Sequence, residues 1–395
     1  MTGTGLPLAG VRVVEMTHMV MGPTCGMILA QLGAEVIKVE PPAGDKTRSL
    51  GGMGTSFFPL FNRGKRSVVL DFAKAEDRDT MHRLLATADV FLENFRDGQL
   101  EKQGLGAEEL RRKYPDLIIA GHKGFMSGPY EHRPALDEVV QMMSGLAAMT
   151  GTVAKPQRVG SSANDIMGGM FGVIAILSAL YQRRSGVANT GGADIRIGLF
   201  ENCLFLVAQH MVEYEMTGNK PRSMPEREHA WPIYDIFETA GGERIFIGVV
   251  TEGHWQSFCR EFGLQDFADD PTLLTTTDRI MARARIIPRV TQEIKRWDAA
   301  ELSAKLDRLN ICFSPINRPE DLLHDPHVLR PGGLVNNVNA DGKPFRVPAL
   351  PVEWNGGSLG EGLKVPVLGA DTEAVRAELK QQQLSPAGKV TMRRA

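Results

Sequence analysis

Residues 11–40 read VRVVEMTHMVMGPTCGMILAQLGAEVIKVE, with two short β-branched runs on either side of a helical pattern. We predict a strand at Val11–Met16, a helix at Gly22–Gly33 and a second strand at Glu35–Glu40. Short apolar strands joined by helices are typical of a parallel sheet with helices on both faces. This stretch therefore predicts an α/β fold.

The alternation of strands and helices continues to residue 121. We predict strands at Ser67–Phe72, Val90–Phe95 and Leu117–Gly121, and helices at Lys74–Ala88 and Ala107–Tyr114. Ligands of such sheets bind beyond the carboxyl ends of the strands, so the loops at those ends are the expected site. The loop after the first strand lacks the spacing of a G-x-G-x-x-G motif. A nicotinamide or flavin dehydrogenase is therefore not expected.

A second informative stretch is Ser161–Arg184, SSANDIMGGMFGVIAILSALYQRR, which predicts a long helix that begins near Asp165. Gly168, Gly169 and Gly172 each cost about 1 kcal/mol of helix stability relative to alanine, so we expect something to approach the backbone there. Two interpretations remain open at this point. Asp165 is either the cap of a buried helix, or a reactive carboxylate at the mouth of a site that the glycines clear for a ligand.

Composition limits the class of protein. The chain has 395 residues and a net charge of −2, which allows two domains and predicts no nucleic-acid surface. Its four cysteines lack metal or disulfide spacing, so we expect reduced thiols in a cytoplasmic protein. The first ten residues do not resemble a signal peptide, and the apolar run Ile166–Tyr181 is shorter than a typical membrane span. We therefore expect a soluble protein without a membrane partner.

The second half of the chain changes character near residue 218. A strand at Ala193–Ile197 and a long apolar helix at Leu199–Met216 precede the polar, proline-bearing stretch Gly218–Trp231, which is a linker candidate. Beyond it, Ile233–Glu238 and Arg244–Val250 flank a hairpin signal, and helical patterns follow. We expect a smaller α+β domain there.

The stretch Leu8–Arg48 resembles the opening of the class III CoA-transferase family, also called the CaiB/BaiF family. The resemblance continues at Phe61–Phe72, Ala88–Gly106, Ser127–Gly151, the Asp165 segment, Ile287–Leu302, Ser314–Val328 and Pro366–Val375. It implies a large Rossmann-like CoA-binding domain made of residues 1–217 and 326–395, a linker at 218–231 and a small α+β domain at 232–325. It also implies a homodimer of two interlocked subunits.

The resemblance implies an enzyme that moves CoA between carboxylic acids, with acyl-CoA as a substrate and neither a metal nor a redox cofactor. A protein carboxylate attacks the thioester to give a mixed anhydride and then an aspartyl-CoA thioester. Asp165 matches the nucleophile of the family. A helix N-terminus favours its negative charge, so we expect a carboxylate held ionised by the helix.

The resemblance also implies a set of CoA-binding positions. The segment that wraps the pantetheine and thioester corresponds to His18, Met19, Val20 and Met21. Phe72 corresponds to the adenine position, and the remaining CoA contacts correspond to Asn94, Phe95, Arg96 and Lys102. Some relatives have an arginine where this chain has Pro41, and Lys65 and Arg66 are candidates to replace its contact with phosphate.

One departure separates this chain from the α-methylacyl-CoA racemases of the same family. They use a His–Asp pair where this chain has Leu136 and Asp137. A leucine cannot exchange a proton, so a racemase-like isomerase is the second hypothesis, and Asp137 lines the acyl pocket, orients Asp165 or caps its helix. A non-catalytic acyl-CoA-binding protein is the third.

The acids that exchange CoA are harder to infer. Cationic side chains fall in or beside three loops near the expected site: His18, Lys123, His132, Arg133, Arg227 and His229. We hypothesise dicarboxylic substrates, with succinyl-CoA as the donor and a C4–C6 dicarboxylic acid as the acceptor.

Overall fold

The computed structural model describes residues 5–185 and 191–384. The chain forms two compact units, one made of residues 1–225 together with 327–395 and the other of residues 226–326. We call them unit 1 and unit 2.

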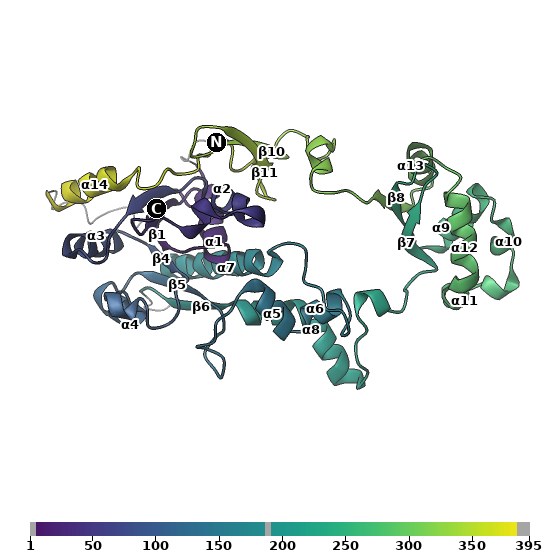
Figure 1. Ribbon diagram of the computed structural model, residues 1–395, viewed down its shortest axis with the longest axis horizontal. Helices are drawn as coiled ribbons and strands as arrows, with labels where there is room; N and C mark the ends of the chain where they lie inside the picture. Colours follow the sequence, from purple (N-terminus) through teal and green to yellow (C-terminus); the bar gives the residue numbers. More distant parts are fainter. Residues whose placement is uncertain (1–4, 186–190, 385–395) are drawn as a thin grey trace. The chain divides into compact units, whose positions relative to one another are not determined.

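Unit 1 is built on a six-stranded sheet in the order β3-β2-β1-β4-β5-β6 (Figure 1). Every neighbouring pair in this sheet is parallel. The strands are β1 (Arg12–Met16), β2 (Glu35–Glu40), β3 (Arg66–Val69), β4 (Val90–Glu93), β5 (Ile118–Lys123) and β6 (Asp194–Gly198). The α/β fold with a parallel sheet predicted from the sequence is confirmed.

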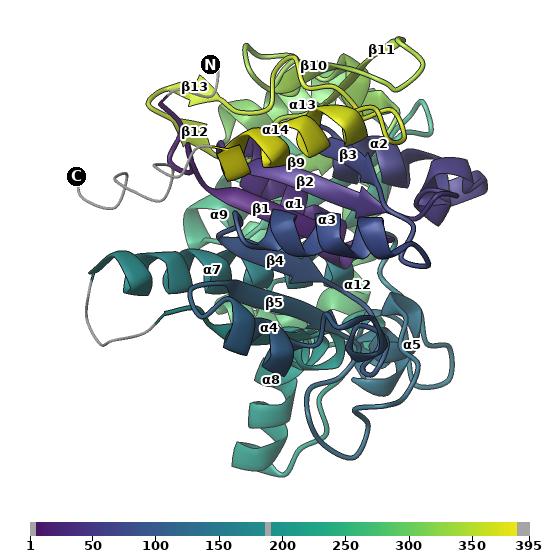
Figure 2. The ribbon, with the colours of Figure 1, turned by 90° about the vertical axis from the view of Figure 1, so that its left-hand side faces the viewer.

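Alternate side chains of the strands pack into two apolar layers, because successive residues of a strand point to opposite faces. Val13 faces a core that includes Cys25 and Val173, whereas Val14 faces a core that includes Met81 and Leu379. The first layer is covered by α1 (Met21–Gln31), α7 (Ala163–Ser185) and α8 (Leu199–Thr217). The second is covered by α3 (Ala75–Leu85), α4 (Ala107–Lys113) and α14 (Thr372–Leu384), which Figure 2 shows in front of the sheet.

The segment after residue 327 returns to unit 1 and covers the edge strand β3. The Ser67 amide donates to the Asp371 carboxylate (2.9 Å), and the Val69 amide donates to Thr372 Oγ1 (3.0 Å). The other elements of unit 1 are α2 (Phe57–Asn62), α5 (Asp137–Met143), α6 (Leu146–Thr150), β10 (Leu334–Val338), β11 (Pro344–Pro348), β12 (Glu353–Trp354), β13 (Gly357–Ser358) and the 3-10 turns η1 (Lys46–Ser49), η2 (Gly52–Ser56) and η3 (Glu101–Gln103).

Unit 2 has an antiparallel sheet in the order β7-β8-β9 with its own apolar core. Its strands are β7 (Ile233–Glu238), β8 (Arg244–Val249) and β9 (Cys312–Pro315). Its helices are α9 (Glu252–Glu261), α10 (Gln265–Ala268), α11 (Thr276–Met281), α12 (Arg283–Ile294) and α13 (Ala299–Arg308), with 3-10 turns η5 (Pro271–Leu273) and η6 (Asp321–His324); η4 (Met224–Glu226) lies at the junction of the units.

The helix α7 is longer than its apolar run suggested. It has 23 residues and is long and apolar enough to cross a membrane by length and composition, the only such helix among the described residues. The helix includes residues on both sides of the apolar run Ile166–Tyr181, and the expectation that the protein has no membrane partner stays a prediction. Within unit 1, α7 packs on α1 and β5 through its glycines.

Candidate active site

The loops after β1 and β4 are joined by a reciprocal pair of hydrogen bonds. The His18 amide donates to Asn94 Oδ1 (3.0 Å), and Asn94 Nδ2 donates to the His18 carbonyl (2.7 Å). The ring of His18 lies 5.6 Å from that of Phe95, centroid to centroid. Residues 76 positions apart are thus brought together beyond the carboxyl ends of neighbouring strands, and the amide of Asn94 holds a loop.

The segment from His18 to Met21 divides into two exposed and two buried residues. His18 and Met19 are exposed, and Met19 has a left-handed backbone with φ of 66°. Val20 and Met21 are buried, the first beside Met27 and Phe61. A ligand can therefore reach His18 and Met19, whereas Val20 and Met21 are covered by protein.

The His18 ring is not a strong cation. Desolvation lowers the pKa of His18 below 6.5, the nearby Asp45 opposes this, and Lys38 and Lys46 lower it further. The imidazole is therefore mainly neutral at neutral pH, so His18 does not fit the expected role of a positive group for a carboxylate.

The first turn of α7 is fixed by a pair of asparagines that the sequence interpretation missed. Asn164 is fully buried and donates to the Leu199 carbonyl (3.0 Å), while Asn202 Nδ2 donates to the Asn164 carbonyl (2.6 Å) and to Asn164 Oδ1 (2.7 Å). These bonds fasten the start of α7 to the start of α8. Asp165, the next residue, is therefore held on a rigid turn, partly buried.

The carboxyl group of Asp165 is not stabilised in the way that the sequence predicted. Burial raises the pKa of Asp165 to about 7, the charge of Asp137 raises it too, and Arg158 opposes the change. Burial and a like charge therefore favour the protonated form of Asp165. The group is a mixture of acid and carboxylate near neutral pH.

Asp137 lies at the start of α5 and is buried. Gln141, one turn later, donates to Asp137 Oδ1 and accepts a hydrogen bond from the Val159 amide (2.9 Å). Asp137 Oδ2 is buried without a hydrogen bond in the described part of the chain. Leu136, the residue before it, is 65% exposed.

The glycines of α7 make room for other protein segments. A Cβ atom on Gly168 would overlap the Met21 side chain, one on Gly169 would lie 2.8 Å from the Met21 carbonyl oxygen, and one on Gly172 would lie 2.5 Å from His122 Nε2. The expectation that these glycines clear space for a ligand is therefore wrong. They allow α1 and β5 to approach α7 closely.

The remaining predicted CoA positions are Phe72, Arg96 and Lys102, and they differ in their surroundings. Phe72 packs partly buried against the layer of α3, and Lys102 is exposed on η3. Arg96 is exposed and lines a small pocket with Lys123 and Arg196. The contacts that join His18, Asn94 and Phe95 do not extend to Phe72 or Lys102.

Several cations that the sequence offered for ligands bind protein groups instead. Lys123 pairs with Glu93 (2.8 Å) and Asp97 (3.2 Å). Arg66 pairs with Glu378 (2.7 Å). Lys65 is buried against Glu15, so both candidates to replace an arginine at position 41 are bound to protein carboxylates.

The chain matches the model of CoA-transferase family III over residues 8–372. The chain belongs to this family. It is therefore an enzyme of the CoA-transferase class, and a crystal structure of a CaiB/BaiF family protein from Brucella suis superposes on it with a TM-score of 0.83 at 33% identity, covering 95% of this chain and 99% of that one.

Two curated relatives of this CoA-transferase carry specific names. It is 31% identical over 388 residues to the succinate–glutarate CoA-transferase of Agrobacterium fabrum, covering 95% of this chain and 96% of the relative. It is 32% identical over 373 residues to the succinyl-CoA–D-citramalate CoA-transferase of Chloroflexus aurantiacus, covering 90% of this chain and 92% of the relative. Among the described residues, no group of three or more His, Cys, Asp or Glu side chains is placed to hold a metal ion.

Proposed function

We propose that this CoA-transferase moves CoA from succinyl-CoA to a C4–C6 dicarboxylic acid, with Asp165 as the acyl carrier. The two named relatives support a succinyl donor, because each name pairs succinate or succinyl-CoA with a second dicarboxylic acid. One observation carries the catalytic assignment: a partly buried carboxyl group with a pKa of about 7 stands on the rigid first turn of α7.

The proposed reaction begins when the Asp165 carboxylate attacks the thioester carbonyl carbon of succinyl-CoA. The C–S bond breaks, CoA thiolate leaves, and a mixed anhydride of Asp165 and succinate forms. The thiolate then attacks the aspartyl carbonyl carbon, which releases succinate and leaves an aspartyl-CoA thioester. The acceptor carboxylate repeats the two steps in reverse order, so acyl-CoA leaves and Asp165 is regenerated.

The environment of Asp165 suits this sequence. A carboxylate that is poorly solvated is more basic than one in water, so its oxygen is a better nucleophile towards the carbonyl carbon. Burial and Asp137 supply that condition. As a consequence, a fraction of the enzyme molecules has Asp165 in its protonated, unreactive form at neutral pH.

We propose that CoA lies along the carboxyl ends of β1 and β4. The exposed His18 and Met19 side chains would face the thioester with Phe95 beside them, and the buried Val20 and Met21 would complete the segment around the pantetheine. Phe72 would contact the adenine, and Arg96 and Lys102, both exposed, would approach the phosphates. Neither a metal nor a redox cofactor is part of this proposal.

A racemase-like isomerase is less well supported. Its proton transfer at the α-carbon needs a base on each face of the substrate, and Leu136 offers none at the start of α5. Asp137 is instead bound by Gln141, and its charge acts on Asp165. A non-catalytic acyl-CoA-binding protein would not need a rigidly held carboxyl group of raised pKa.

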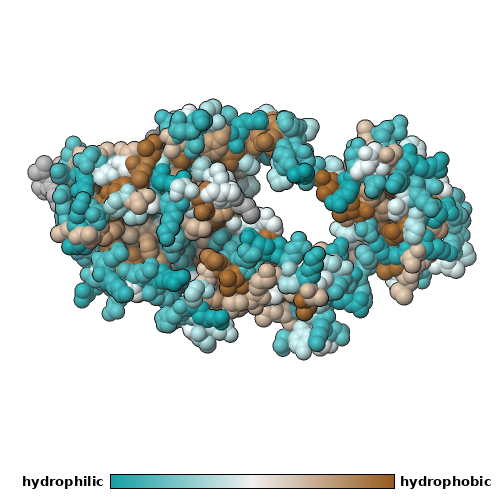
Figure 3. All heavy atoms as spheres, viewed as in Figure 1, coloured by the Kyte–Doolittle hydropathy of each residue, from teal (hydrophilic) through white to brown (hydrophobic). Residues whose placement is uncertain are grey.

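We also propose that the protein acts as a soluble, cytoplasmic homodimer of interlocked subunits. In unit 1 a row of exposed apolar side chains runs along α7 and α8: Met170, Ile174, Tyr181, Phe205, Met211, Val212 and Met216. Patches of this kind mark interaction surfaces, and a second copy of the chain would cover them. Figure 3 shows hydrophobic residues, in brown, on the visible face of both units.

The strand order β3-β2-β1-β4-β5-β6 supports the proposal of a Rossmann-like large domain. We propose residues 1–217 and 326–395 as that domain, 218–231 as a linker and 232–325 as the small domain. The two compact units support this division.

A donor–acceptor matrix tests the substrates, with each CoA ester measured by mass spectrometry. We expect transfer from succinyl-CoA to dicarboxylic acids and none with Asp165→Ala. Hydroxylamine added with succinyl-CoA should convert Asp165 to a hydroxamate and inactivate the enzyme. Turnover with monocarboxylic acids alone would refute the substrate class, and transfer by Asp165→Ala would refute the carrier.

A further inference from the structure

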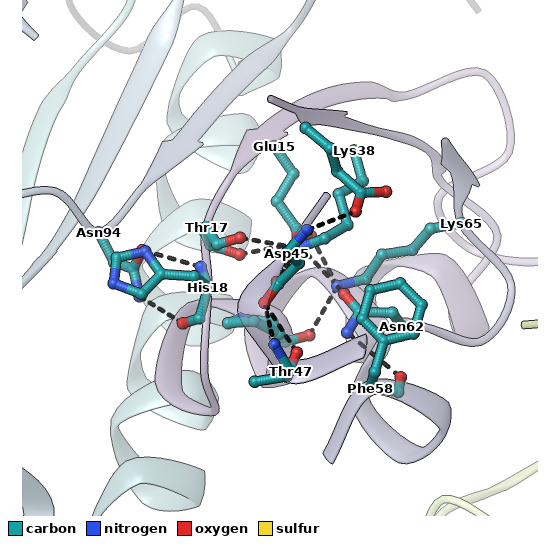
Figure 4. A network of polar contacts seen from close by, with 12 residues as sticks. Glu15, Thr17, His18, Lys38, Asp45, Thr47, Phe58, Asn62, Lys65 and Asn94 are labelled. Atoms are coloured by element: carbon teal, nitrogen blue, oxygen red, sulfur yellow. Dashed lines mark hydrogen bonds and ion pairs between the residues drawn. The ribbon is translucent and has the colours of Figure 1, made fainter. Parts of the chain in front are cut away.

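A buried network of two lysines and two carboxylates lies beside the His18 loop (Figure 4). Glu15 and Lys38 stand on β1 and β2, Asp45 precedes η1, and Lys65 precedes β3. All four are at most 6% exposed. Their formal charges balance, so the network as a whole is neutral.

The ion pairs form a chain through the network. Lys65 Nζ lies 2.8 Å from the Glu15 carboxylate, Lys38 Nζ lies 3.5 Å from Glu15 Oε1, and Lys38 Nζ lies 3.0 Å from Asp45 Oδ2. Burying such charges is costly, and apolar residues of similar volume often replace a buried ion pair without loss of stability. Stability alone therefore does not explain this network.

The lysines also bind two backbone carbonyl groups that bracket the site loop. Lys38 Nζ donates to the Thr17 carbonyl (2.7 Å), and Lys65 Nζ donates to the Pro23 carbonyl (3.0 Å). Between these two fixed points lie His18 to Gly22, with the left-handed Met19. A non-glycine residue in this conformation is strained, and the surroundings must hold it there.

The helix α1 is packed onto the same network. A Cβ atom on Gly26 would overlap Glu15 Oε2. Thr17 Oγ1 donates to Glu15 Oε1 (2.7 Å), and Asn62 Oδ1 accepts from Lys65 (3.0 Å). Glu15 therefore links the end of β1, the first turns of α1 and the segment before β3.

We propose that Lys38 and Lys65 are positioning residues for CoA transfer, each fixing one end of the His18–Gly22 backbone through a carbonyl group. Glu15 and Asp45 serve to neutralise and orient the two ammonium groups. The loop is then already in its ligand-binding conformation before acyl-CoA arrives, which places the thioester carbonyl carbon for attack by Asp165. This inference rests on the proposed function of His18 to Met21 and of Asp165.

Two charge-balanced double variants test the proposal. Glu15→Gln with Lys65→Met removes the Pro23 tether and leaves the pair of Lys38 and Asp45 intact. Lys38→Met with Asp45→Asn removes the Thr17 tether and leaves the pair of Glu15 and Lys65. The matched control is Arg376→Met with Asp77→Asn, which removes an ion pair between α14 and α3.

Each double variant should keep its thermal midpoint within a few degrees and lose at least about ten-fold in kcat, with a smaller change in KM for succinyl-CoA. Hydrogen exchange of unliganded protein should become faster in the peptide that covers residues 17–24 and stay unchanged in α8. The control should keep kcat within about two-fold.

Unchanged kcat in both folded double variants would overturn the proposal, and so would unchanged exchange in residues 17–24. If one double variant fails to fold, the other double variant still tests the remaining tether by the same two measurements. Failure of the proposed function has a different signature, because wild-type protein would then transfer no CoA or form no hydroxamate at Asp165.

Discussion

Asp165 titrates in the field of Asp137: burial first, and then the charge of Asp137, raise the pKa of Asp165 to about 7. Asp165 lies in the first turn of α7 and Asp137 is the first residue of α5, so the two residues are 28 positions apart in the sequence. The negative charge of Asp137 therefore favours the protonated form of Asp165.

The rate of CoA transfer should increase with pH through about 7, because the proposed nucleophile is the ionised form of Asp165. Asp137→Asn removes the like charge and should move the midpoint of kcat/KM to lower pH by roughly one unit. Arg158→Gln removes the opposing charge and should move it to higher pH. The measurement is the pH profile of kcat/KM with succinyl-CoA for wild type, Asp137→Asn and Arg158→Gln. A midpoint that stays fixed in both variants would contradict the assignment of the profile to Asp165.

Asp165→Asn should abolish transfer and stabilise the fold near neutral pH. The folded pKa is raised above the ordinary 3.8, so the stability that this group contributes is fully present below 3.8 and is lost as the pH rises through about 7. An asparagine cannot ionise, so the variant should gain roughly 1–3 kcal/mol over wild type at about pH 8, and little at about pH 4. Urea unfolding at both values measures the gain. A lower stability of Asp165→Asn at the higher pH would show that the folded protein stabilises the ionised form of Asp165.

Gly169→Ala and Gly168→Ala form a matched pair in α7. A Cβ on Gly169 lies 2.8 Å from the Met21 carbonyl oxygen and 2.7 Å from Thr24 Cβ, so α1 and α7 must separate, at a cost of roughly 1–3 kcal/mol. A Cβ on Gly168 meets the flexible end of Met21, and the gain in helix propensity of about 1 kcal/mol offsets the contact. The midpoint temperature of thermal unfolding should be similar for Gly168→Ala and wild type, and clearly lower for Gly169→Ala. Equal stability of the two would contradict the close packing of α1 on α7.

Asn94→Ala should weaken the loop that we propose to bind acyl-CoA, because it removes both hydrogen bonds to the His18 backbone. We expect KM for succinyl-CoA to increase by roughly five- to thirty-fold, corresponding to about 1–2 kcal/mol. Asn94→Asp keeps the acceptor for the His18 amide but loses the donor to its carbonyl, so its KM should lie between those of wild type and Asn94→Ala. Steady-state kinetics of the three proteins decides this, and an unchanged KM in both variants would show that the pair does not shape the site.

The sequence by itself determined the architecture of unit 1 and the candidate nucleophile. The alternation of short β-branched runs with helical patterns identified the parallel strands. Such strands are apolar on both faces and are separated by crossover helices. The cap residues and apolar run around Asp165 placed it at the start of a long helix. These features depend on neighbours a few residues away, which a sequence displays directly.

Charged residues inside predicted strands were a signal that could have been used. Glu15 in VRVVEM and Lys38 in EVIKVE interrupt runs that belong to a buried parallel sheet. A charge at such a position requires a partner of opposite charge, so the sequence could have predicted that a buried ion pair exists. Its partners Asp45 and Lys65 were not, because loop residues show no such period.

Only the tertiary structure decided what the site groups do. It showed that Gly169 makes room for α1, that Asn94 binds the backbone of a residue 76 positions away, and that burial and the charge of Asp137 raise the pKa of Asp165. Each outcome depends on which distant segments come into contact and on how much water they exclude. Because dielectric environment and close packing are properties of the assembled fold, the order of residues alone does not specify them.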